Sequence, residues 1–175
     1  MRITAFYYGA DVSPAEHVLY DVDQKILSQA SSLPFDARYV VLVSHHGIAT
    51  THVVTAECGV VTTRGVTLPG PMSSPQALAW FLTDIVVDTG ALTDIFFSCH
   101  ASGHALYPDG TDDDDALSLN DVARVLETVG VPSLTSVYLD GCCQATLEAV
   151  DTFRNVCAHI VAYETFCPWE RAHLF

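Results

Sequence analysis

The sequence has 175 residues, half of them apolar, which is enough to bury the core of one ordinary domain spanning residues 1–175. Seven Lys and Arg against 21 Asp and Glu give a formal charge of -14, and such a surface repels phosphate backbones and anionic lipid. We therefore expect neither nucleic acid nor a membrane as a partner. Residues 1–11 resemble a strand instead of a signal peptide, and no apolar run approaches the roughly 20 residues of a membrane span. These features predict a cytoplasmic protein with reduced thiols.

The first third of the chain alternates strand and helix patterns. Residues 2–8 form an apolar, strand-like run, and residues 13–30 open with a capping box and continue with apolar residues at helical spacing. The β-branched run 38–44 predicts a strand that is covered on both sides. Residues 51–65 predict a hairpin that turns near Gly59.

The rest of the chain continues this alternation with three helices and three strands. The first of these helices begins at a Ser-Pro pair, and the second has a capping box and a glycine stop. The predicted helices cover 73–87, 117–130 and 146–156, and the predicted strands cover 93–99, 136–140 and 159–164. Strand and helix in alternation predict an α/β fold, with a mostly parallel sheet and helices on both faces.

Reactive side chains follow several of the predicted strands. In a parallel sheet, ligands and chemistry gather at the carboxyl ends of the strands, so the residues just past each strand matter most. Those segments are 9–11, 44–47, 99–104 and 140–143. One strand-loop-helix-strand unit separates His100 from Cys142, which predicts that their two strand ends lie side by side. A thiol nucleophile and an imidazole base would then meet through the fold.

The residues around Cys142 suit a reactive thiol. A helix that opens at Gln144 would place the positive end of its dipole near the sulfur and favour the thiolate. Backbone amides at such a helix start can also hold the oxyanion of an acyl-transfer intermediate. Gly141 would let the chain turn sharply before Cys142, and Cys143 would point to the opposite side and pack inward.

The segment from residue 140 to 162 resembles the region around the nucleophile of the clostripain-like (C11) cysteine peptidases, which belong to the caspase-like group. The family pattern is met, without a gap, by Asp140, Gly141, Cys142, Ala145, Glu148, Phe153, Arg154, Asn155, Val161 and Ala162. The similarity extends upstream to the opening strand, to the helix before the histidine strand and to the acidic loop before the cysteine strand. It covers nearly the whole chain.

This resemblance implies a caspase-like α/β/α sandwich and a cysteine endopeptidase that cleaves after Arg or Lys. Carried over residue by residue, it makes Cys142 the nucleophile, His100 the proton-transfer partner and Asp140 the floor of the pocket for a basic side chain. The partner would be a protein or peptide with a basic residue. Ala101 is a departure, because the family places Gly after its histidine. We expect no cofactor; the acidic run 112–115 leaves calcium as an alternative to a solvated surface.

Other assignments of the reactive residues remain open from the sequence. His104 and His46 compete with His100 as the base, and His46 could pair with Cys99 as an alternative nucleophile. Cys99, His100, His104 and Cys142 are also a weak match to the spacing of zinc ligands. Two other functions therefore stand beside the peptidase. One is an inactive caspase-like binding or scaffold module, and the other is a small metal-binding or redox protein.

Overall fold

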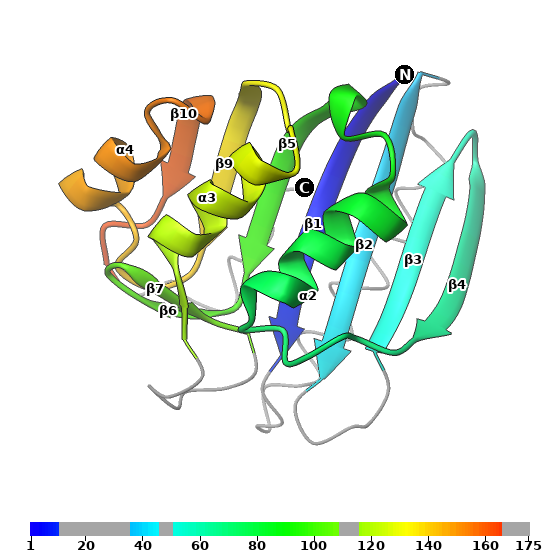
Figure 1. Cartoon of the computed structure of the whole chain (residues 1–175), viewed down its shortest axis with the longest axis horizontal. Coiled ribbons are helices and arrows are strands. Elements are labelled where there is room, and N and C mark those ends of the chain that lie inside the picture. The colour runs from blue at the N-terminus through cyan, green and yellow to red at the C-terminus, as the bar shows by residue number, and fades with distance from the viewer. Residues whose placement is uncertain (11–35, 46–50, 109–115, 166–175) are drawn as a thin grey trace.

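The computed structural model describes residues 1–10, 36–45, 51–108 and 116–165, and its centre is a seven-stranded sheet (Figure 1). The strand order is β10-β9-β5-β1-β2-β3-β4. The strands are β1 (Arg2–Ala10), β2 (Ala37–His45), β3 (Thr51–Glu57), β4 (Val60–Val66), β5 (Leu92–Ser98), β9 (Leu134–Asp140) and β10 (Cys157–Ala162).

The sheet is parallel from β10 to β2 and antiparallel at β3 and β4. All the predicted strands are present, and the predicted hairpin is the β3–β4 pair. Its turn is formed by Cys58 and Gly59, whose φ angles of 51° and 76° both lie in the left-handed region. The mostly parallel α/β architecture expected from the sequence is therefore confirmed.

The helices capped by Ser74 and Ser118 begin where the sequence predicts. Helix α2 (Pro75–Trp80) is capped by Ser74 and continues as a π-helical segment, η1 (Phe81–Val86), before the short 3₁₀ turn η2 (Thr89–Ala91). Helix α3 (Leu119–Thr128) is capped by Ser118, whose hydroxyl accepts from the Asp121 amide at 3.1 Å. Helix α4 (Leu147–Phe153) is capped by Thr146. The predicted helix at 13–30 lies outside the described residues.

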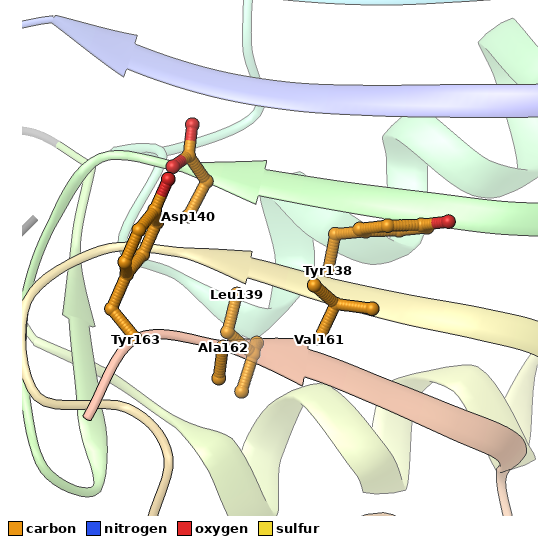
Figure 2. A pocket seen from close by; sticks show the side chains of 6 residues that line it. All are labelled: Tyr138, Leu139, Asp140, Val161, Ala162 and Tyr163. Carbon is orange, nitrogen blue, oxygen red and sulfur yellow. The ribbon is translucent and has the colours of Figure 1, made fainter. Parts of the chain in front are cut away.

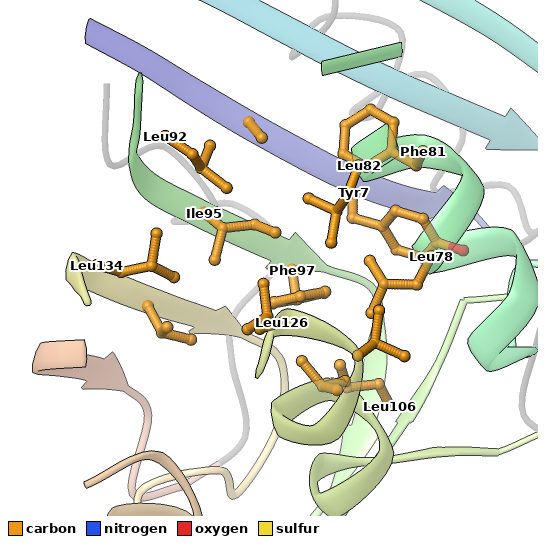
Figure 3. Packing of buried hydrophobic residues seen from close by; sticks show 14 of the residues in the cluster. Tyr7, Leu78, Phe81, Leu82, Leu92, Ile95, Phe97, Leu106, Leu126 and Leu134 are labelled. Atoms are coloured by element: carbon orange, nitrogen blue, oxygen red, sulfur yellow. The ribbon is translucent and has the colours of Figure 1, made fainter. Parts of the chain in front are cut away.

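The main core lies between one face of the sheet and these helices (Figure 3). Ile95 and Phe97 of β5 contribute to it, and so do Phe81 of η1 and Leu126 of α3, all of them fully buried. Burying a side chain of this size contributes roughly 1.5–3 kcal/mol. Tyr7 joins the cluster because its hydroxyl is satisfied, donating to the Met72 carbonyl at 2.7 Å.

The opposite face of the sheet carries a row of aromatic rings. Phe96 of β5 stacks on Phe6 of β1 and on Tyr138 of β9, with ring centroids 4.7 Å and 3.9 Å apart. Phe6, Tyr8, Val41, Val43 and Val54 are buried on this face. The described helices all pack on the first face, so a helical layer on the second face stays a prediction.

A second, three-stranded sheet was not predicted. It consists of β6 (His100–Ser102), β7 (Ala105–Tyr107) and β8 (Leu117–Ser118), in the order β6-β7-β8. Strands of two or three residues are too short to show a hydrophobic period, which is why the sequence did not reveal them. Pro108, which follows β7, packs against the carboxyl end of β1. A Cβ added to Gly9 would lie only 2.1 Å from the Pro108 carbonyl oxygen.

We predict that Gly9→Ala destabilises the protein by about 1–3 kcal/mol, because the new methyl group would overlap the Pro108 backbone. Thermal unfolding measures this as a midpoint lowered by roughly 2–4 °C per kcal/mol in a chain of this size. Gly65→Ala in β4 is the matched control, since an added Cβ there meets nothing within 4 Å. Equal midpoints for the two variants would contradict the close packing at Gly9.

Candidate active site

The strands that precede His100 and Cys142 are neighbours in the sheet. β5 and β9 run parallel, and Ser98 is the register partner of Asp140 at their carboxyl ends. His100 in β6 lies two residues after Ser98, and Cys142 lies two residues after Asp140, in the turn that follows β9. The structure therefore brings together the two strand ends that the sequence analysis singled out.

The two strand ends are in close contact at Gly141. A Cβ at this position would lie 2.4 Å from the Ala101 Cβ and 3.0 Å from the Cys99 carbonyl oxygen. Because side chains alternate along a strand, His100 and Ala101 point to opposite sides of β6. The contact explains why residue 141 is a glycine in a chain that has alanine at 101.

The chain bends at Gly141, as expected, but the bend does not use the positive φ that glycine permits. Its φ angle is not among the positive values of the described residues, whereas Cys143 has a φ of 56°. Residues other than glycine rarely adopt this left-handed conformation. The Cys143 amide donates to the Thr165 carbonyl at 2.9 Å and the Ala145 amide donates to the Tyr163 carbonyl at 2.9 Å. The turn after Cys142 is thus tied to the segment that follows β10.

The expected helix start at Gln144 was wrong. Helix α4 begins at Leu147, and Thr146 caps it by accepting from the Ala149 amide at 3.1 Å. The influence of a helix dipole falls off within about one turn of the helix end. Because α4 begins five residues after Cys142, its dipole offers that thiol little.

Asp140 lies at the end of a small pocket of about 150 Å³ beside β9 and β10 (Figure 2). The pocket is lined by Tyr138, Leu139, Asp140, Val161, Ala162 and Tyr163. The Ser98 hydroxyl donates to Asp140 Oδ2 at 2.9 Å and so holds the carboxylate in place. Figure 2 shows the Asp140 carboxylate and the Tyr163 hydroxyl pointing toward one another.

Sequence reasoning missed Ser98 and Tyr163 as parts of this site. Ser98 could have been found by aligning the ends of the two neighbouring strands, since it is the register partner of Asp140. Tyr163 follows β10, so its approach to Asp140 depends on how that strand pairs with β9. The resulting pocket is apolar along its walls and acidic at one end.

The alternative residues are placed differently. His104 is exposed in the turn between β6 and β7, at the far end of the hairpin from His100. Cys99 is only 5% exposed and belongs to the main core, which favours a packing role. His46 lies outside the described residues. Strand β1 separates β2 from β5, so the strand ends that would carry His46 and Cys99 are not neighbours.

The metal alternatives gain no support from the described part of the chain. No three His, Cys, Asp or Glu side chains gather there in a way that could hold a metal ion, so Cys99, His100, His104 and Cys142, the weak match to zinc-ligand spacing, form no such cluster. The acidic run 112–115, suggested as a calcium site, lies outside the described residues. Within the described ranges, every helix is too short or too polar to cross a membrane.

Comparison with known proteins identifies the fold. No protein-family model matches the sequence, and no curated protein matches it. A secreted C11 cysteine protease from Bacteroides thetaiotaomicron, solved with an irreversible peptide inhibitor, superposes with a TM-score of 0.75 at 16% identity. An inactive zymogen C11 protease from Parabacteroides distasonis superposes with a TM-score of 0.71 at 12% identity.

The chain has the fold of the C11 cysteine proteases. Each of these two comparisons covers 97% of the chain, and the chain spans about half the length of each solved structure. A third structure, iotapain, a secreted C11 protease from the same Bacteroides species, gives a TM-score of 0.73 at 12% identity. The caspase-like fold class expected from the sequence is thereby confirmed. The cytoplasmic location stays a prediction, because two of these neighbours are secreted proteins.

We predict that Gly141→Ala unfolds the site locally or globally, because the added methyl group would overlap Ala101. Ala101→Gly alone should be nearly neutral in thermal unfolding. In the double variant, the alanine at 141 gains the space that Ala101 vacated, so the midpoint should recover part of the loss.

The two changes should therefore be strongly non-additive, as contacting residues are. Recovery should stay incomplete, since the Cys99 carbonyl would still lie 3.0 Å from the new Cβ. Additive effects of the two substitutions would show that the strand ends do not meet at this point.

Proposed function

We propose that the protein is a cysteine endopeptidase that hydrolyses peptide bonds after Arg or Lys, with Cys142 as nucleophile and His100 as its proton-transfer partner. The observation that carries this proposal is the contact between the ends of β5 and β9, which sets the two reactive residues on adjoining segments. The C11 fold supports the same reaction class. Cys142 is half-buried, whereas Cys99 is buried in the core, which is the reason for choosing Cys142 as the nucleophile.

The proposed reaction proceeds by acyl transfer. Cys142 gives its thiol proton to His100, and the sulfur then attacks the carbonyl carbon of the scissile bond while the carbonyl oxygen takes up the negative charge. His100 delivers a proton to the leaving amine as the carbon–nitrogen bond breaks, which leaves a thioester on Cys142. Water then gives a proton to His100 and attacks the thioester, releasing a carboxylic acid and restoring the thiol.

Asp140 supplies the proposed specificity for basic residues. Its carboxylate stands at one end of an apolar pocket, so the aliphatic stem of Arg or Lys would lie along the walls and the charged head would reach the carboxylate. Tyr163 and Tyr138 add aromatic surface, on which a guanidinium group packs well. The formal charge of -14 adds a long-range attraction for cationic peptides.

An inactive binding module with this fold is the second candidate. It is favoured by Ala101, which stands where the clostripain-like pattern has Gly. Such a module would bind basic peptides at the Asp140 pocket without cleaving them. Turnover of a peptide substrate distinguishes the two functions.

We predict that Cys142→Ala abolishes hydrolysis of a fluorogenic peptide with Arg before the scissile bond. His100→Ala should lower kcat by about 10²–10⁴-fold, as the loss of a general acid-base group does. Cys143→Ala is the matched control, because it removes the adjacent thiol and should retain activity. Circular dichroism and thermal unfolding establish that each variant is folded. Activity that survives Cys142→Ala but is lost in Cys99→Ala would assign the nucleophile to Cys99.

We predict that Asp140→Asn removes the preference for Arg over citrulline, its neutral isostere. This preference should persist at high salt in the wild type, because a direct, charge-assisted pair is screened far less than the long-range surface potential, which decays over about 8 Å. The measurement compares kcat/KM for the two peptides at low and high salt. If the preference for Arg faded with salt, or survived Asp140→Asn, it would arise from the acidic surface as a whole and not from Asp140.

A further inference from the structure

Gln144 is a buried amide in the turn that follows Cys142. Its side chain is 0% exposed, although glutamine is mostly a surface residue. The side-chain Nε2 reaches toward two carbonyl oxygens, that of Ala105 in β7 at 3.4 Å and that of Cys142 at 3.5 Å. Its Oε1 has no hydrogen-bond partner among the described residues.

This arrangement is costly for the fold. A buried polar atom without a partner loses its hydration and gains nothing in return. Two contacts at the long end of the hydrogen-bond range offset little of that loss. An apolar side chain of similar size would fill the same space, so core packing alone does not account for a glutamine here.

The position of Gln144 suggests what the amide does. The turn that carries Cys142 touches the β6–β7 hairpin, which carries His100, at two points. Gly141, the residue before Cys142, meets Ala101, and Gln144, two residues after Cys142, meets Ala105. The NH₂ group of Gln144 has two protons, so it can donate to the Ala105 and Cys142 carbonyls at once.

We propose that Gln144 is a positioning residue, which ties the Cys142 turn to the hairpin and thereby fixes the thiol relative to the His100 imidazole. The proposal rests on the proposed peptidase dyad of Cys142 and His100. It adds to that dyad a neutral side chain that would act on the geometry of the two residues and not on their charge. A reacting group displaced by about 1 Å loses on the order of 10²-fold in rate, so a modest tie can have a large effect.

The test is a double-mutant cycle between Gln144→Met and His100→Ala. Methionine has nearly the volume of glutamine and cannot donate, so the thermal midpoint should stay within about 4 °C of the wild type. With an Arg peptide, Gln144→Met should lower kcat by about 10- to 100-fold and leave KM and the preference for Arg over citrulline unchanged. Gln76→Met is the matched control, since Gln76 is exposed in α2.

A second measurement does not require peptidase activity. Iodoacetamide alkylation of Cys142, followed by mass spectrometry, reports the reactivity of the thiol directly. Both Gln144→Met and His100→Ala should slow it, and Gln144→Met should cause no further slowing when His100 is already alanine, because residues that act through one geometry are non-additive. The Cys157 thiol is an internal reference, since burial raises its pKa and keeps it slow in every variant.

The possible failures are distinguishable. Slowing by His100→Ala with none by Gln144→Met, in both kcat and alkylation, overturns the positioning role and leaves the proposed dyad intact. Additive effects of the two substitutions, or a kcat loss that tracks a loss of thermal stability, show a merely structural role and also overturn it. No effect of His100→Ala on either readout overturns the dyad and the positioning role together.

Discussion

The parallel pairing of β5 with β9 is the constraint on which the candidate site depends. It aligns Ser98 with Asp140, so the segments that follow the two strands leave the sheet side by side. The missing side chain at Gly141 then lets these segments close on each other until Ala101 occupies the space that a Cβ would need. The proposed nucleophile and base are thus placed by backbone pairing and packing, which are more rigid than a contact between two long side chains.

The same strand ends also carry the proposed recognition pocket. Along β9, Val137 and Leu139 face the helix-side core, so Tyr138 and Asp140 face the opposite side of the sheet. The pocket at Asp140 is built there from β9, β10 and the segment after β10. A hydrogen bond from Ser98 of β5 orients the carboxylate, which links the pocket to the strand that precedes His100. One pairing therefore serves both the proposed reaction and its specificity.

The sequence predicted the strands, the hairpin and the starts of α2 and α3 because each has a local cause. The hydrophobic periodicity of a strand or helix, the capping residue of a helix and the turn at Gly59 each depend on only a few neighbouring residues. It also predicted that the ends before His100 and Cys142 adjoin, since this follows from strand order. It failed for β6, β7 and β8, which are too short to show a period, and for the helix placed at Gln144. The roles of Ser98, Gln144 and Gly141 depend on contacts with residues far along the chain, which no local pattern encodes.

Covalent labelling of the wild-type protein tests directly whether Cys142 is the nucleophile of an Arg-selective site. A peptidyl acyloxymethyl ketone with Arg at the position that alkylates would be compared with the same probe carrying citrulline, and the modified residue would be identified by peptide mapping. The account predicts rapid labelling at Cys142 alone, by the Arg probe and far less by its neutral counterpart. Labelling at Cys99 or Cys143 instead, or equal labelling by both probes, would contradict it.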